Sequence, residues 1–413
     1  MVYVLNIQKH PLMPCTEAKA RKLLKQNKAK IIKYEPFTIQ LLFECDNQTQ
    51  NINLGVDAGS KHIGLSATTI NKELYSADIE IRNDIVGKLA SRREIRKTRR
   101  GRLRYRQPRF DNRINSKNKG WLAPSVEYKI NSHISAIQRI HAILPVTKII
   151  IETAQFDIQK IQHEDIRNEQ YQQGDQLGFW NVREYIIWRD GHMCRNCGGK
   201  SKDKRLNVHH IESRKTGGNA PNNLITLCET CHTNYHNGNI QLKIKRGKKF
   251  NHEAFMGIMR KTLFQRLTNI YPYIEETYGY ITKNIRIQNN LPKEHYIDAK
   301  CISGNPQAEP MTYYFYQKRV RKQNRKITKD KFIKNGKKQN NQLQKEIFGF
   351  QLFDSVQYKN EKYFIFSRRT SGYFDIRDLY GNKINNGSID YKKLKLIQHN
   401  NTILTEKRNN EKT

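Results

Sequence analysis

The stretch NVHHIESRKTGGNAPNNLITLCETCHTNYH (residues 207–236) places two adjacent histidines and a Cys-x-x-Cys pair on either side of a turn-rich loop. A second Cys-x-x-Cys pair lies just upstream, at residues 194–197. Two such pairs supply four thiolates, which close a tetrahedral Zn²⁺ site and leave no position open for water. The spacing therefore predicts a structural zinc site with four ligands: Cys194, Cys197, Cys228 and Cys231.

The residues between the two pairs predict a β-hairpin followed by a helix. LNVHHIES and LITLC are strand-like, TGGNAPNN is a loop, and ETCHTNYH begins a helix. His210 is expected on the first strand and His232 at the start of the helix, facing it. His209 is expected to point to the opposite side of that strand, and Asn223 to bind the loop backbone and so orient a base.

These parts are what a nuclease with one catalytic metal ion needs. A hard divalent cation bridges the scissile phosphate, and a neutral imidazole with a pKa near the working pH deprotonates the attacking water. The residues alone leave a second interpretation open, in which the module is a zinc ribbon that binds nucleic acid and its histidines have no catalytic role.

The charge balance of the chain indicates an anionic partner. The 413 residues include 75 Lys and Arg against 38 Asp and Glu, for a net charge of +37. Such a field destabilises a compact protein unless something anionic neutralises it, and nucleic acid is the first candidate. No apolar run approaches the roughly 20 residues of a transmembrane helix, so no membrane partner is expected. The odd cysteine count with this spacing favours a reducing compartment and a metal over disulfides.

Residues 87–110 are rich in helix formers and in arginine, and almost lack acids. They predict one long helix, with Gly101 as its weak point. Guanidinium groups bind phosphate well, and arginines on successive turns can contact the phosphate backbones of several nucleic-acid strands at once. A merely solvated charged face is the alternative. The nucleic-acid contacts expected on this helix are Arg92, Arg93, Arg96, Arg99, Arg100 and Arg104.

A second candidate site comes from acids at the ends of apolar strands. Asp57 ends the strand in NLGVDAGSKHIG, and Glu152 ends the strand IIIE. His295 and Asp298 are three residues apart, hence on one face of a helix. Such carboxylates can hold two cations that clamp the attacking and leaving oxygens of a phosphodiester, and His295 can bind a metal or move a proton. Each piece alone fits a turn or a solvated helix face equally well.

The two ends of the chain predict small additional modules. Residues 16–29 are helical and residues 31–43 alternate as a strand, so that residues 1 to about 50 form one basic unit. Residues 317–345 are rich in Lys, Arg, Gln and Asn and predict a linker or a segment that is ordered on nucleic acid. The last 65 residues alternate as short strands with Gly turns, which predicts a small β-barrel-like module.

The order of these features resembles one family. An Asp strand, an Arg-rich helix, a Glu strand, an inserted His-His, Asn, Cys-x-x-Cys-His module and a final His-x-x-Asp follow one another as in the IscB family. These are transposon-encoded relatives of the type II CRISPR effectors. The PLMP motif at residues 11–14 and the stretches EIFGFQLFDSV and RRTSGYFDIR look like that family too.

The resemblance implies an α/β multidomain fold. It is an RNase H-like RuvC domain that is split by an arginine-rich bridge helix and by a zinc-stabilised ββα-metal HNH domain. The implied domains are a PLMP domain (1–52), RuvC parts (53–84, 113–180 and 246–302), the bridge helix (85–112), the HNH domain (181–245) and a β-rich C-terminal domain (303–413).

The resemblance also implies an RNA-guided, Mg²⁺-dependent DNA endonuclease. A guide RNA (the ωRNA) pairs with one strand of target DNA that carries a target-adjacent motif, which the protein reads. HNH would cut the paired strand with His210 as the base and one Mg²⁺ on His209 and His232. RuvC would cut the displaced strand with two Mg²⁺ on Asp57, Glu152, His295 and Asp298. Asn223 takes the central position of the HNH motif, and His236 is an additional candidate for the same site. We expect a monomer in a ribonucleoprotein, in a prokaryotic cytoplasm and at the nucleoid when bound to target.

Two rival functions remain at this stage. A non-guided HNH nicking or homing endonuclease would bind defined DNA through its side chains and need no RNA. A non-enzymatic RNA-binding protein with a structural zinc would cut nothing in magnesium. Neither rival needs a second group of acids together with an Arg-rich helix.

Overall fold

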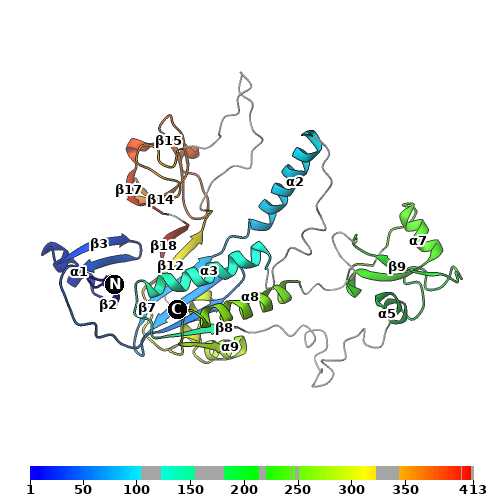
Figure 1. Cartoon of the computed structure of the whole chain (residues 1–413), viewed down its shortest axis with the longest axis horizontal. Helices are drawn as coiled ribbons and strands as arrows, with labels where there is room; N and C mark the ends of the chain where they lie inside the picture. Colours follow the sequence, from blue (N-terminus) through cyan, green and yellow to red (C-terminus); the bar gives the residue numbers. More distant parts are fainter. Residues whose placement is uncertain are drawn as a thin grey trace. The chain divides into compact units, whose positions relative to one another are not determined.

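The chain divides into two compact units, which are described separately: Met1–Ala154 with Ile258–Thr413, and Gln155–Gly257. The computed structural model describes residues 1–103, 122–153, 181–213, 220–242, 244–246, 251–321, 344–400 and 402–410 (Figure 1). Within these ranges no helix combines the length and the apolar character that a membrane crossing requires.

The N-terminal residues form a small mixed sheet with one helix. Its strands lie in the order β2-β1-β4-β3, and α1 packs on its core. The elements are β1 (Val2–Leu5), β2 (Pro11–Cys15), α1 (Glu17–Lys25), β3 (Ala29–Tyr34) and β4 (Phe37–Leu41). The helix is confirmed, and the Thr16 hydroxyl caps it by accepting from the Lys19 amide. The single strand expected over 31–43 is instead a hairpin, because Pro36 fixes its own φ and lacks the N–H that a continuous ladder needs.

A seven-stranded sheet carries the core of the first unit. Its order is β11-β8-β5-β6-β7-β12-β18. Three consecutive strands form an antiparallel meander, β8 runs parallel to β5, and β11 runs parallel to β8. Burial is almost unbroken along the three central strands, although polar residues are interleaved with apolar ones, so this sheet is covered on both faces. The bounds are β5 (Asn53–Ala58), β6 (His62–Thr68), β7 (Glu73–Glu80), β8 (Lys148–Glu152), β11 (Ile274–Thr277), β12 (Tyr313–Arg319) and β18 (Ile403–Asn409).

Helix α10 (His295–Ile302) lies against β5 and β6 at a very short distance. A Cβ atom at Gly55 would lie 1.9 Å from the Ala299 carbonyl oxygen, and one at Gly64 would lie 1.9 Å from the His295 carbonyl oxygen. Only glycine permits this approach at both positions. The two glycines therefore fix how the first turn of α10 meets the end of β5. The other helices of this unit are α2 (Ile85–Leu103), α3 (Pro124–His141), α8 (Asn251–Thr268) and α9 (Gly279–Gln288).

The range 303–413, expected as one C-terminal domain, does not coincide with one sheet. Strands β12 and β18 extend the seven-stranded sheet, with β12 parallel to β7. Alternate residues of β12 are buried. Any half-buried strand has this pattern, so the pattern does not indicate which sheet the strand joins. A separate five-stranded sheet, in the order β16-β15-β14-β13-β17, lies between them in sequence. It comprises β13 (Ser355–Tyr358), β14 (Glu361–Arg368), β15 (Tyr373–Arg377), β16 (Ile389–Asp390) and β17 (Lys395–Gln398).

The second unit has the predicted hairpin and helix. Strand β9 (Leu206–His210) pairs antiparallel with β10 (Leu224–Cys228), and α7 (Glu229–His236) follows directly. A preceding helix, α5 (Val182–Arg189), packs on both strands through Tyr185 and Ile186. A short 3-10 turn, η3 (Pro221–Asn223), leads into β10.

The long helix expected over 87–110 is confirmed as far as Leu103, where the description of α2 ends. Arg92, Arg93 and Arg96 are exposed on it. Arg99 and Arg100 belong to the helix, but their side chains lie outside the described residues, as does Arg104 altogether. Residues 322–343 of the expected linker also lie outside them.

Candidate functional sites

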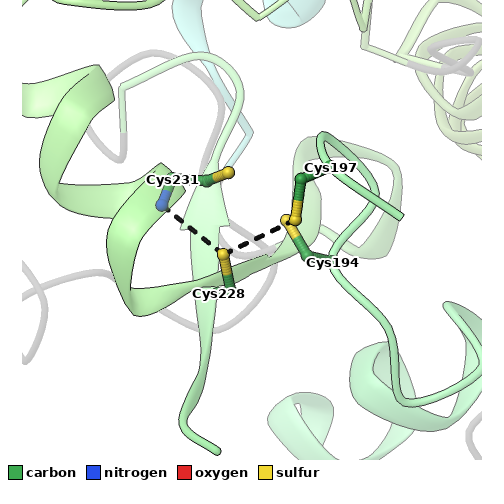
Figure 2. Close-up of side chains that lie close together, drawn as sticks. All are labelled: Cys194, Cys197, Cys228 and Cys231. Atoms are coloured by element: carbon green, nitrogen blue, oxygen red, sulfur yellow. Dashed lines mark hydrogen bonds between the residues drawn. The ribbon is translucent and has the colours of Figure 1, made fainter. Parts of the chain in front are cut away.

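The four cysteines of the second unit converge as the spacing predicts. Cys194 and Cys197 come from a loop after α5, and Cys228 and Cys231 from the junction of β10 and α7 (Figure 2). The four sulfur atoms all lie within 4.8 Å of one another, and the sulfurs of Cys197 and Cys228 are 3.8 Å apart. Four sulfurs at this separation are the donor set of a closed, structural Zn²⁺ site.

Polar groups around the cluster favour thiolates over thiols. The Ser201 hydroxyl donates to the Cys228 sulfur at 2.9 Å, and the Asn196 amide donates to the Cys231 sulfur at 3.3 Å. Burial nevertheless raises the pKa of the Cys228 thiol to about 12. A divalent cation reverses this effect and deprotonates the thiol. The residues present therefore fit a Zn²⁺ ion, which would be held by these four cysteines.

Replacing Cys194 by serine is expected to unfold the second unit, because the binding energy of a structural zinc is folding energy. The zinc content should fall by about one ion per chain, and any cleavage of nucleic acid by this unit should disappear. Zinc analysis and limited proteolysis between residues 181 and 246 measure this. Cys45→Ser, outside the cluster, is the matched control and should keep the metal. Full HNH cleavage by Cys194→Ser without bound zinc would contradict the assignment.

Three histidines form a second cluster on the same unit. His209 of β9 meets His232 and His236 of α7, and their ligand nitrogens all lie within 4.8 Å of one another. The ring centroids of His209 and His232 are 5.2 Å apart. The structure thus brings together His209 and His232, the two residues that the resemblance assigned to one metal ion. His236 joins because it lies four residues, about one turn, beyond His232.

The histidine cluster has the properties of a cation site. Burial lowers the pKa of His209 to about 4, and burial also lowers the pKa of His232. Both imidazoles are therefore neutral at pH 7, the form that binds metals. The His209 Nε2 atom is buried and has no hydrogen-bond partner among the described residues. A buried polar atom without a partner costs folding free energy unless a cation or a water molecule binds to it.

Asn223 fixes the loop that follows His210. It is fully buried, and its side-chain oxygen accepts from the Glu212 amide at 2.9 Å while its side-chain nitrogen donates to the Glu212 carbonyl at 3.0 Å. Its own carbonyl accepts from the Ile211 amide. His210 ends β9 immediately before this loop and is half-buried. The backbone on which His210 is carried is thus held in one position.

The second candidate site lies at the end of β5 in the first unit. The His295 Nδ1 atom of α10 is 2.6 Å from the Asp57 carboxylate. Glu152, at the end of β8, accepts from the Arg260 guanidinium at 3.2 Å. Asp298 is ion-paired with Arg286 at 2.9 Å. The three acids expected from the sequence are therefore gathered by two adjacent strands and one helix.

The charge of Asp57 acts on the other two acids. Burial, followed by the nearby charge of Asp57, raises the pKa of both Glu152 and Asp298. The hydrogen bond that the His295 Nδ1 atom donates to the Asp57 carboxylate raises the pKa of His295. In the described part of the chain, this group is not among the sets whose ligand atoms all lie within 4.8 Å of one another; Glu152 and Asp298 are ion-paired with arginines. Crowded carboxylates balanced by cationic side chains fit divalent cations, whose charge would keep the acids ionised.

Several residues of the two sites were not found from the sequence. His62 stacks on His295 with ring centroids 5.0 Å apart and planes 5° apart, and its Nδ1 atom is 2.9 Å from Asp78. Arg260 and Arg286 come from helices whose sequences carry no visible site motif. His236, by contrast, was an additional candidate from the resemblance, and the structure places it with His209 and His232.

Comparisons with known proteins agree with this arrangement. Residues 2–174 match the RRXRR protein family, and residues 194–238 match the HNH endonuclease family. The chain is also similar to Anaredoxin of Nostoc sp. (strain PCC 7120), with 34% identity over 58 residues, which is 14% of this chain and 74% of that protein. The HNH match contains both the cysteine and the histidine clusters. The chain therefore contains an HNH endonuclease domain, and the two family matches together support an HNH-containing, IscB-like nuclease.

Proposed function

We propose that this protein is an RNA-guided DNA endonuclease that makes double-strand breaks by hydrolysing one phosphodiester in each strand. The HNH domain cuts the strand that is paired with the guide, and the Asp57 site cuts the displaced strand as a RuvC-type site. The observation that carries the proposal is the presence of two separate hydrolase-type sites in one chain, the histidine cluster on α7 and the acids around Asp57.

The sheet topology supports the RuvC assignment. An antiparallel meander whose first strand, β5, is followed outward by the parallel strands β8 and β11 is the arrangement of an RNase H-like sheet. Asp57 on its first strand and Glu152 on the adjacent parallel strand then occupy neighbouring strand ends. Helix α10 brings Asp298 to the same edge through its close approach at Gly55 and Gly64.

In the HNH domain, we assign the proton transfer to His210. His210 would accept the proton of the attacking water, and the Asn223 bonds to the Glu212 backbone would hold the base in position. His209, His232 and His236 would hold a cation, which when bound supplies charge at the scissile phosphate. Three imidazoles suit Ni²⁺ or Zn²⁺ better than Mg²⁺, which prefers oxygen ligands.

At the RuvC-type site, the carboxylates of Asp57, Glu152 and Asp298 offer oxygen donors, the ligands that Mg²⁺ prefers. These acids would hold two Mg²⁺ ions, whose charge would stabilise the oxygen of the attacking water and the leaving oxygen of the cut strand. Arg260 and Arg286, now ion-paired with Glu152 and Asp298, would keep these side chains oriented. His295, hydrogen-bonded to Asp57, is placed to hold or move a proton at its imidazole.

The guide RNA is proposed from charge and from the RRXRR match. A net charge of +37 requires a large polyanion, and the exposed arginines of α2 present guanidinium groups on successive turns. We assign the N-terminal sheet and the five-stranded sheet to contacts with the ωRNA and with the target-adjacent motif. The protein would act as a monomer in a ribonucleoprotein of a prokaryotic cytoplasm.

Exchange of the guide segment tests the guided function. The RNA that copurifies with the protein is sequenced, its guide is replaced, and the cut positions are mapped on two plasmids in Mg²⁺ with added Ni²⁺. We expect cleavage to move to the plasmid that matches the new guide. Cleavage that stays at the same DNA sequence would support a non-guided HNH nicking enzyme, and RNA binding without any cleavage would support a non-enzymatic RNA-binding protein.

A further inference from the structure

Two tyrosines next to the Asp57 site present their rings to solvent. The side chains of Tyr278 and Tyr280 are 51% and 66% exposed. Their ring centroids are 6.0 Å apart and their planes differ by 17°, so the rings are stacked on each other. Exposed aromatic rings cost hydration free energy, and a stacked pair presents a flat apolar face that another π-system can cover.

The backbone fixes these rings beside Glu152. Strand β11 pairs with β8 so that Thr277 lies opposite Glu152, and the Thr153 amide donates to the Thr277 carbonyl at 3.2 Å. Tyr278 is the next residue. A Cβ atom at Gly279, between the two tyrosines, would lie 3.1 Å from the Glu152 Oε1 atom. Tyr278 therefore follows the residue that pairs with Glu152, and Glu152 supplies a carboxylate of the proposed RuvC-type site.

Neither ring is needed to build the local fold. Tyr278 begins α9 through its carbonyl oxygen, which accepts from the Ile281 amide at 3.0 Å, and any residue can supply that atom. Helix α9 is anchored by Thr282, which is 4% exposed. Lys283 is exposed about one turn beyond Tyr280 and adds a cation suited to a phosphate backbone.

We infer that Tyr278 and Tyr280 form a nucleobase-stacking subsite for the single DNA strand that is cut at the Asp57 site. The inference rests on the proposed function of that site. A base of the displaced strand would stack on the exposed face of the pair and so hold the neighbouring phosphate near Glu152. Stacking on aromatic rings tolerates every base, which suits a site that must cut whatever sequence the guide selects.

Removing one base from the displaced strand and removing the two tyrosine rings should each slow cleavage of that strand, and the two effects should not add. The full-length protein with its RNA cuts duplexes whose displaced strand carries one abasic nucleotide, moved stepwise past the cut. We expect wild-type cleavage of that strand to fall about 5- to 150-fold at one or two positions. The double variant Tyr278→Ala/Tyr280→Ala should lose about the same factor on the intact strand and show no further abasic effect.

Matched controls separate stacking from damage to the fold. Tyr273→Ala removes a ring that is 72% exposed at the start of β11, away from Glu152, and should behave like wild type. Tyr278→Phe/Tyr280→Phe keeps both rings and should keep full activity. Cleavage of the guide-paired strand reports on folding and should not change. An alanine double variant that cuts the intact strand at the wild-type rate, or still shows the abasic effect, overturns the subsite.

If the wild-type protein does not cut the displaced strand, the proposed function is wrong, but the stacking subsite is still open to test. A binding measurement then decides whether the subsite exists. A short thymidine oligonucleotide with one 5-iodouracil is irradiated with the ribonucleoprotein without divalent ions. We expect crosslinks at Tyr278 or Tyr280 that disappear in the alanine double variant. Crosslinks that persist in that variant, or crosslinks of these tyrosines to the copurified RNA in place of the oligonucleotide, overturn the subsite.

Discussion

Replacing Asp57 by alanine is expected to lower cleavage of the displaced strand by about 10³-fold or more, while the guide-paired strand is cut at the wild-type rate. Stabilisation of the transition-state charge by metal ions is worth several kcal/mol, and each 1.36 kcal/mol is a factor of ten in rate. Asp57 is the acid whose charge reaches both Glu152 and Asp298. Loss of Asp57 therefore weakens the binding of metal ions by all three acids.

Cleavage of a duplex labelled differently on each strand measures the effect of Asp57→Ala. Asp57→Asn preserves the size of the side chain and should be equally inactive on the displaced strand, because a neutral amide cannot replace the charge. Glu275→Ala is the matched control, since Glu275 is an exposed acid of the same sheet that pairs with Lys148. Undiminished cleavage of both strands by Asp57→Ala would remove the RuvC-type site from the account.

Replacing His210 by alanine is expected to have the reciprocal effect. Loss of a general base lowers the rate about 10²- to 10⁴-fold, and only the guide-paired strand should be affected. His210 is not one of the three clustered histidines, so His210→Ala should still bind the catalytic metal. His209→Ala should lose both that metal and the cleavage, because His209 lies in the cluster with His232 and His236.

Metal content and strand-resolved cleavage together distinguish these roles. His192→Asn is the matched control: His192 is an exposed histidine of the same unit with a φ of 54°, a conformation that asparagine tolerates. It should keep both metals and both cuts. If His210→Ala cuts both strands as wild type does, or if it loses the catalytic metal along with its cleavage, His210 is not the base.

The HNH unit could be predicted in detail because its information is local. Two Cys-x-x-Cys pairs, a turn-rich loop and a two-residue strand period specify the hairpin, the helix and the side to which His209 points. The resemblance, and not the local pattern, placed His209 with His232, because the sequence does not say which face of β9 the helix α7 covers. That choice depends on packing across the hairpin.

The Asp57 site was less accessible from sequence because its contacts span the chain. Asp57 and His295 are hydrogen-bonded across 238 residues, and no local pattern announces Arg260 as the partner of Glu152. Strands β12 and β18 likewise join the seven-stranded sheet at an edge that only tertiary packing selects. Strand ends, helix spacing and segment order placed the acids, but not the cations that balance them.

The central claim is that two independent sites in one RNA-bound chain each cut one strand. Strand-resolved cleavage of a matching duplex by the wild type, by Asp57→Ala and by His210→Ala, each with and without its RNA, tests it most directly. We predict double-strand breaks by the wild type, opposite single-strand nicks by the two variants, and no cutting once the RNA is removed. Cutting that survives removal of the RNA, or loss of the same strand's cleavage in both variants, would contradict the account.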